Sequence, residues 1–287
     1  MDSHWKILAC DLDGTVIGWN RKINDRDLEA LKAARESGIH VAICTGRNSR
    51  ECAALIGQLQ LDGLGVFVNG AMVCDTATGA AVDSQYIDDA LVAEAIDFFG
   101  GRGHALLVLA DEPASRLPEY YLTDHGLPHD ATTDWLRVNG VHARLVSALP
   151  THTRGRIVRL GVVVDVPEES ALHASLQEHF GTRAASHSIY SPHYDCQILE
   201  FFNRNANKWS GLEHLARVMN VSSARVITIG DDINDVAMLQ GAALSFVMGD
   251  AKDSIKKHAK RVTQPHAQCG VAEVIDLLLG GKLEPAS

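Results

Sequence analysis

The amino-acid sequence predicts an α/β protein with a doubly wound parallel sheet, and three features of the chain predict it. Apolar runs such as Ile7–Cys10 and Ile39–Cys44 are continuous rather than alternating, a pattern typical of parallel strands buried on both faces. Amphipathic helical segments separate these runs, so strands and helices alternate along the chain. Polar residues stand directly after the strands, at the edge of the sheet where ligands of such folds bind.

Composition and charge narrow the class of protein. The chain has 287 residues, of which 46% are hydrophobic, enough for one large core or for a core with a smaller companion. A formal net charge of −10 argues against a nucleic-acid partner. No apolar run approaches the ~20 residues of a membrane span, and the N-terminus lacks a basic segment followed by an apolar signal. We therefore expect a cytoplasmic protein with no membrane partner.

The six cysteines point to the same compartment. They lie far apart, and none forms a C-x-x-C pair with metal or redox spacing. Free cysteines are usually small buried apolar residues in reducing compartments. We expect six free thiols that pack in the interior.

The first elements follow from caps and turn residues. Asn24 is a favourable N-cap for an amphipathic helix that Gly38 ends. A second helix is expected from about 48 to 59, and the apolar strand after it stops at the strong turn signal Asn69-Gly70.

The pattern becomes less regular between about Asp83 and Ser191, and 111–153 is left unassigned. Helices and strands here could build a core of their own. We therefore expect a core domain formed by 1–83 and 192–287, interrupted by a smaller α/β domain at 84–191. The segments concerned favour helices at 88–100 and 167–181 and strands at 104–110 and 156–166.

The last third of the chain is expected to complete the core domain. A buried strand covers Val226–Ile229 and ends at Gly230, and the segment before it favours a strand followed by a helix. The remaining segments favour a short strand at 243–249 and helices at 251–262 and 270–280.

Two carboxylates, Asp11 and Asp13, follow the first strand and precede a turn at Gly14. Repulsion and desolvation both disfavour such a pair in a stable fold. A metal ion or a proton transfer is the expected reason for it. On the pair alone, a helix-capping turn or a fragment of a calcium-binding loop stays open.

Four features in chain order narrow these alternatives. They are DLDGT at 11–15, a strand ending in Thr45-Gly46-Arg47, Lys208 at the start of a helix, and GDDIND at 230–235. In this combination the sequence resembles the haloacid dehalogenase superfamily, in particular the Cof-type phosphatases, which carry an α/β cap between the second and third motifs. The resemblance covers the core motif by motif and the cap by size and position, and it implies a Rossmann-like core with an inserted cap.

The resemblance implies roles for the acidic residues and the lysine. Asp11 would be the nucleophile that forms an aspartyl phosphate, Asp13 the general acid and base, and Lys208 a charge that stabilises both nucleophile and phosphoryl group. Mg²⁺ would be bound by the Asp11 side chain, the Asp13 backbone carbonyl and Asp231. Asp235 would either bind the metal directly or hold its ligands in place.

Further residues would bind the substrate. Thr45 offers a hydroxyl and Gly46 a backbone N–H to the phosphoryl oxygens, and Asn234 would contact the phosphate or its water. Arg47 and Asn69 face the same edge of the sheet and are expected to bind the organic part of the substrate.

These features predict Mg²⁺-dependent hydrolysis of phosphate monoesters of small metabolites, by resemblance most often sugar phosphates, by a monomer or homodimer. One departure from the family pattern is Asp250, where a charge replaces the expected asparagine amide. Two alternatives stay open. A phosphosugar mutase would return the phosphoryl group to a sugar, and a non-catalytic sugar-phosphate sensor would keep the pocket without the chemistry.

Overall fold

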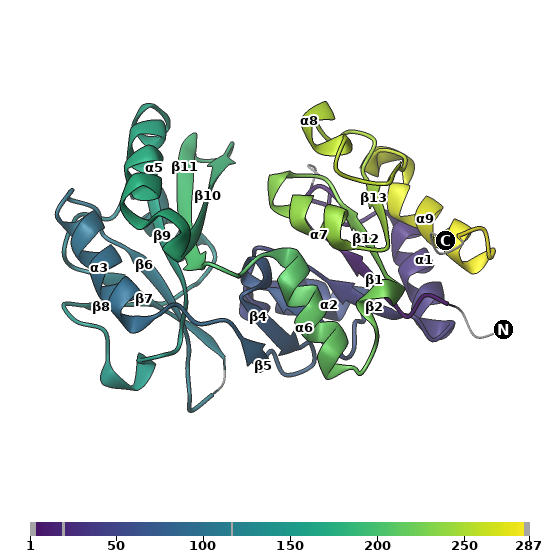
Figure 1. Ribbon diagram of the computed structural model, residues 1–287, viewed down its shortest axis with the longest axis horizontal. Coiled ribbons are helices and arrows are strands. Elements are labelled where there is room, and N and C mark those ends of the chain that lie inside the picture. The colour runs from purple at the N-terminus through teal and green to yellow at the C-terminus, as the bar shows by residue number, and fades with distance from the viewer. Residues whose placement is uncertain (1–3, 19–20, 116, 284–287) are drawn as a thin grey trace. The chain divides into compact units, whose positions relative to one another are not determined.

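The computed structural model describes residues 4–18, 21–115 and 117–283 and divides them into two compact units (Figure 1). The first unit comprises the described residues up to Asp83 and from Asn207 onwards, and the second comprises Ser84–Ala206. The second boundary therefore differs from the expected one at 191. The reason is strand β11 (Cys196–Asn203), which lies between two strands of the second unit and pairs with both.

The first unit is built around a parallel sheet with the strand order β14-β13-β12-β1-β2. The central strand β1 pairs in parallel on both sides, so that Ile7 lies opposite Val226 and His40. All four residues of β1 are buried, as its continuous apolar run predicts. The strands are β1 (Ile7–Cys10), β2 (His40–Ile43), β12 (Val226–Gly230), β13 (Leu244–Val247) and β14 (Arg261–Val262).

Helices pack against this sheet. Leu212 and Leu215 of α6 and Met238 of α7 share a core with Ile7 and Ala9 of β1. Helices α1 and α9 lie side by side (Figure 1). The helices are α1 (Asp25–Glu36), α2 (Ser49–Leu59), α6 (Lys208–Val218), α7 (Val236–Gly241), α8 (Asp253–Lys256) and α9 (Gly270–Leu279).

The helix expected over 251–262 is wrong beyond its first turn. Only Asp253–Lys256 is helical, and the chain then forms β14. The backbone N–H of Lys260 donates to Ser245 Oγ at 3.1 Å, and Lys260 Nζ donates to the carbonyl of Ala243 at 2.7 Å. These contacts hold the segment beside β13 and override its helical pattern.

A three-stranded antiparallel sheet follows α2 and comprises β3 (Leu64–Phe67), β4 (Met72–Asp75) and β5 (Ala81–Ser84). The backbone N–H of Thr45 donates to the carbonyl of Val66 at 3.0 Å, which places β3 beside the end of β2. The turn expected at Asn69-Gly70 joins β3 to β4.

The second unit is a six-stranded sheet in the order β10-β11-β9-β6-β7-β8. Helices α3 and α5 cover one face of it (Figure 1), and their apolar side chains share a core with those of the strands. The unassigned stretch 111–153 contains β7, α4 and β8. The elements are α3 (Asp89–Gly100), β6 (Leu107–Asp111), β7 (Pro118–Thr123), α4 (Asp130–Val138), β8 (Ala143–Val146), β9 (Ile157–Asp165), α5 (Val166–Phe180) and β10 (Ala184–Ser191).

All six cysteines are free thiols, as expected, and five of them are buried, with Cys269 partly exposed. Burial raises the pKa of the Cys10, Cys44 and Cys52 thiols above the usual value. Within the part of the chain that the structure describes, no helix is both long and apolar enough to span a membrane.

Candidate active site

The chain leaves β1 at Asp11 and turns sharply at Gly14. The backbone N–H of Asp11 donates to the carbonyl of Ile229 at 2.9 Å, which ties the start of the turn to β12. Gly14 has φ +94°, and a Cβ atom there would lie 2.2 Å from Asp231 Oδ2. Only glycine therefore allows the turn to approach the Asp231 carboxylate so closely.

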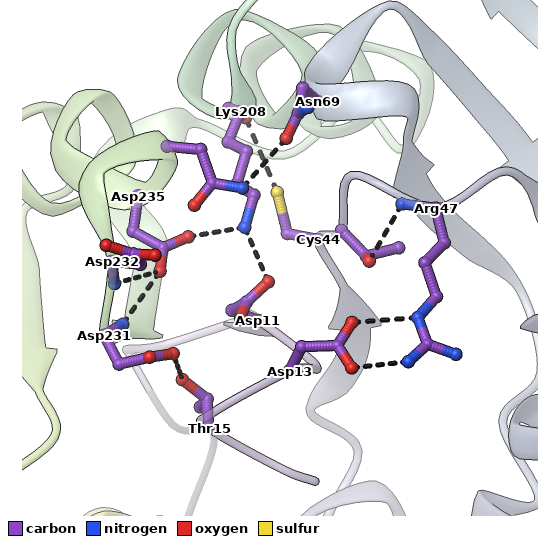
Figure 2. A network of polar contacts seen from close by, with 12 residues as sticks. Asp11, Asp13, Thr15, Cys44, Arg47, Asn69, Lys208, Asp231, Asp232 and Asp235 are labelled. Atoms are coloured by element: carbon purple, nitrogen blue, oxygen red, sulfur yellow. Dashed lines mark hydrogen bonds and ion pairs between the residues drawn. The ribbon is translucent and has the colours of Figure 1, made fainter. Parts of the chain in front are cut away.

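Lys208 is the first residue of α6 and its side chain is 0% exposed. Its Nζ lies 2.5 Å from Asp11 Oδ1 and 2.6 Å from Asp235 Oδ1 (Figure 2). A buried ammonium group costs several kcal/mol unless it is paired, and these two carboxylates pair it. The motif identified Lys208 from the sequence, although a lysine at a helix start is ordinarily solvated.

Gly70 allows α6 to start at this point, and sequence reasoning noticed it only as a turn residue. Its φ is +96°, and a Cβ atom would lie 1.9 Å from the carbonyl oxygen of Asn207. The turn between β3 and β4 therefore contacts the backbone immediately before Lys208. In the sequence, only the turn signal Asn69-Gly70 pointed to this position.

The acidic side chains carry shifted pKa values. Burial raises the pKa of Asp11 well above its usual range, although Lys208 opposes the shift. Burial and the neighbouring Asp235 raise the pKa of Asp231 to about 7, and the hydrogen bond from Thr15 opposes this shift. Burial disfavours the charged form of Lys208, but Asp11 and Asp235 outweigh it and raise its pKa. The shifts reflect an excess of negative charge, because three buried carboxyl groups surround the single buried ammonium group of Lys208.

Asp11, Asp231 and Asp235 form a group that suits a metal ion. Each offers one carboxylate oxygen, and these atoms lie within 4.8 Å of one another. Oxygen ligands of this kind are preferred by small divalent cations such as Mg²⁺. The excess of buried negative charge fits a cation at the same place.

Asp235 contacts more of the site than the other two carboxylates. Its Oδ1 accepts from Lys208, and its Oδ2 accepts from the backbone N–H groups of Asp231 at 2.8 Å and Asp232 at 3.0 Å. These bonds fix the loop that carries Asp231. The hydroxyl of Thr15, which sequence reasoning missed although it belongs to DLDGT, donates to Asp231 Oδ1 at 2.8 Å.

The Asp13 carboxylate lies outside this group and faces Arg47 (Figure 2). Arg47 Nε lies 2.8 Å from Asp13 Oδ2, and Arg47 Nη2 lies 2.5 Å from Oδ1. This is the bidentate geometry typical of arginine and carboxylate. The two side chains are 38% and 49% exposed, so this ion pair contacts solvent while Asp11 is buried.

The structure brings the expected phosphate-binding and substrate-binding residues together. The backbone N–H of Asn69 donates to the carbonyl of Thr45 at 3.0 Å, and Asn234 Nδ2 donates to Asn69 Oδ1 at 3.0 Å. A Cβ atom on Gly46 would lie 3.1 Å from the Asn69 amide. Asp250 lies exposed beyond β13.

A family model described as haloacid dehalogenase-like hydrolase matches residues 8–275. A Streptococcus pyogenes protein that is provisionally named a phosphatase is 28% identical over 278 residues, which cover 94% of this chain and 97% of that protein. The 5-amino-6-(5-phospho-D-ribitylamino)uracil phosphatase YitU of Bacillus subtilis is 25% identical over 287 residues, which cover 96% of this chain and 98% of YitU. The solved structure of the HAD subclass IIB sugar phosphatase BT4131 is similar with a TM-score of 0.74 and 20% sequence identity. The match covers 97% of this chain and 100% of the BT4131 chain, and it shows that the two share a fold.

Proposed function

The chain belongs to the haloacid dehalogenase-like hydrolases, and we propose that it hydrolyses phosphate monoesters of small metabolites with Mg²⁺. Its relatives that are named as phosphatases support a phosphoric monoester hydrolase. The observation that carries the proposal is the buried Asp11 carboxylate, held by Lys208 beside Asp231 and Asp235. This arrangement places the nucleophilic carboxylate beside the positive charge of Lys208, which would stabilise the negative charge of a phosphoryl group during transfer.

Asp11 is the proposed nucleophile. Lys208 holds its Oδ1 and leaves Oδ2 to attack phosphorus, so that a bond forms from Asp11 to phosphorus while the bond to the leaving oxygen breaks. Water then attacks the aspartyl phosphate and releases inorganic phosphate. Because Lys208 is buried and fixed by Asp235, its charge is in place before the substrate arrives.

Asp13 is the proposed general acid and base. It gives a proton to the leaving oxygen in the first step and takes one from the attacking water in the second. The exposure of Asp13 fits this role, because an acid that serves both the leaving group and water needs access to each.

The remaining residues bind metal and substrate in this proposal. Asp11, Asp231, Asp235 and the backbone carbonyl of Asp13 would hold Mg²⁺, which supplies positive charge that lets a phosphate approach these carboxylates. The proposed phosphate-binding residues are Thr45, Gly46 and Asn234, and the proposed substrate-binding residues are Arg47 and Asn69.

Sugar phosphates are the proposed substrate class. YitU is named for a phosphorylated ribityl compound, and BT4131 is described as a sugar phosphatase. The six free thiols fit the cytoplasm as the proposed compartment.

Asp11→Asn is the decisive test. We expect this variant to lose turnover while it stays folded, because the amide preserves the shape of the side chain and removes its nucleophilicity, and Asp235 remains to pair Lys208. Asp276→Asn, which changes an exposed carboxylate of the same unit, is the matched control and should keep full activity. Release of phosphate by Asp11→Asn at the wild-type rate would contradict the proposal.

Metal and acceptor dependence separate the alternatives. Chelation should stop phosphate release, and added Mg²⁺ should restore it. Steady release of inorganic phosphate without a sugar acceptor excludes the mutase. A protein that binds sugar phosphates without any turnover would instead be the sensor.

A further inference from the structure

Two side chains among the residues assigned to the site carry a positive charge, and they differ in exposure. Lys208 is 0% exposed and pairs with Asp11 and Asp235, on the side of the nucleophile. Arg47 is 38% exposed and pairs with Asp13, on the side of the proposed general acid. Of these two, Arg47 is therefore the cation that a substrate can reach from solvent.

Arg47 has N–H donors that Asp13 does not use. A guanidinium group carries five N–H donors, and Asp13 accepts from Nε and from Nη2. Within residues 4–18, 21–115 and 117–283 the structure gives Arg47 Nη1 no partner. Arg47 can therefore keep its contact with Asp13 and bind a second anion through Nη1.

The neighbouring charges make this cation selective. Asp11, Asp13, Asp231 and Asp235 all lie in the site, and the chain has a net charge of −10. A second anionic group on a substrate is repelled by these carboxylates and is attracted by Arg47. Carboxylate and phosphoryl oxygens match the planar guanidinium in a bidentate way, as the Asp13 carboxylate already does here.

We propose that Arg47 selects phosphate monoesters whose organic part carries a second anionic group, a carboxylate or a further phosphoryl group. The inference rests on the proposed function, because Asp13 is placed at the leaving oxygen by that proposal. A residue that contacts Asp13 through two hydrogen bonds lies beside the organic part of the substrate. Arg47 is thus a specificity-determining residue for the leaving group.

Pairs of esters that differ by one anionic group test the inference. In the first pair, 3-phosphoglycerate carries a carboxylate where glycerol 3-phosphate carries a hydroxymethyl group. In the second pair, glucose 1,6-bisphosphate carries one phosphoryl group more than glucose 6-phosphate. Wild-type protein should show a higher kcat/KM for the anionic member of at least one pair, and the pair that responds identifies the anion. Arg47→Gln should reduce that ratio about tenfold or more, the effect of losing a charge-assisted hydrogen bond.

The ratio isolates the contact with the second anion. Loss of Arg47 also changes the surroundings of Asp13. For glucose 1,6-bisphosphate, hydrolysis at C6 is followed through its product glucose 1-phosphate, so both members of each pair lose a primary alcohol and need the same proton, and this effect cancels. Arg47→Lys keeps the charge without the fork and should give an intermediate ratio. Arg26→Gln removes the same charge from an exposed side chain that pairs with Asp276. It is the matched control and should leave the ratio unchanged.

Binding gives a second measurement without turnover. Dissociation constants of the four esters for Asp11→Asn, with and without Arg47→Gln, should show the same selective loss for the anionic members. An unchanged ratio in Arg47→Gln, or a wild-type preference for the neutral members of both pairs, would overturn the inference while leaving phosphatase activity intact. Failure of wild-type protein to release phosphate from any of the four esters would instead contradict the proposed function, and the inference with it.

Discussion

Asp11, Asp231 and Asp235 share one small volume with a single buried ammonium group. Lys208 pairs with two of the three carboxylates, whereas Asp231 accepts from the neutral hydroxyl of Thr15. Burial and the charge of Asp235 therefore raise the pKa of Asp231 to about 7. Without a bound cation, Asp231 holds a proton at pH values where a solvated carboxylate has lost it.

The stability of the metal-free protein should consequently fall as pH rises. The pKa of Asp231 is raised from 3.8 to about 7, so within this window the folded protein binds a proton that the unfolded chain has released. Stability is then lost with increasing pH across the window. In the presence of chelator, we expect the melting temperature to be lower at pH 8 than at pH 5. Asp231→Asn should reduce this slope but not remove it, because burial raises the pKa of Asp11 as well.

Mg²⁺ provides the complementary measurement, because metal ligands must be ionised. The ion should raise the melting temperature more at pH 8 than at pH 5 in wild-type protein, and little in Asp231→Asn. An Asp231→Asn variant with the wild-type slope and the wild-type response to Mg²⁺ would contradict the role of Asp231.

The residues of the site could be predicted largely from motifs, but their environments could not. The motifs DLDGT and GDDIND identified Asp11, Asp13 and Asp231, because carboxylates directly after buried strands do not stabilise the fold and therefore indicate a function. The full burial of Lys208 and the ion pair of Asp13 with Arg47 depend on how distant segments pack. No local pattern encodes such contacts.

At the scale of elements, cap and turn residues located the first helix, and apolar periodicity located the second. Asn24 marks the start of α1, as expected, although its side chain makes no capping hydrogen bond. Asn48 and Asn207, which the sequence did not single out as caps, do cap their helices: their side chains accept from the backbone N–H groups of Glu51 and Ser210. Strand β10 (Ala184–Ser191) was not predicted, because its small and polar residues show no strand-like alternation. Its position comes from pairing with β11 along its whole length.

Gly70→Ala tests how one turn positions α6. Alanine at φ +96° costs about 1–2 kcal/mol in backbone strain, and its Cβ would collide with the Asn207 carbonyl at 1.9 Å. We expect a large loss of stability in urea unfolding and a loss of phosphate release, because Lys208 follows Asn207 directly. Gly38→Ala is the matched control, since φ is +85° there and no atom lies within 4 Å of the added Cβ.

The two glycine variants separate strain from collision. The free energy of unfolding of Gly38→Ala should fall only by the cost of the backbone strain, and this variant should keep its activity. Equal stability and equal activity of the two variants would show that the contact between Gly70 and Asn207 does not position Lys208.

At the scale of the whole molecule, β11 decides where the inserted unit ends. The sequence places this apolar strand directly before the helix that begins at Lys208, which suggested that it belonged to the core domain. In the structure Leu199 and Phe201 of β11 share a core with α3, α5 and β9. Long-range pairing of this kind is not encoded by spacing along the chain.

Two fragments of the chain test this boundary. A fragment of residues 84–206 contains the whole six-stranded sheet with its two covering helices, and we expect it to unfold cooperatively in urea. A fragment of residues 84–191 lacks β11, so β10 loses the strand with which it pairs and β9 loses a neighbour. The core also loses Leu199 and Phe201, and burial of side chains of this size contributes about 1.5–3 kcal/mol each.

The shorter fragment should therefore show no cooperative transition by circular dichroism, and its amide resonances should be poorly dispersed. Neither fragment should release phosphate, because Asp11 and Lys208 lie outside both. Matching cooperative unfolding of the two fragments would return the boundary to 191 and would make β11 dispensable to the inserted unit. If only the longer fragment folds, this unit needs β11 and the chain re-enters the first unit only after Ala206.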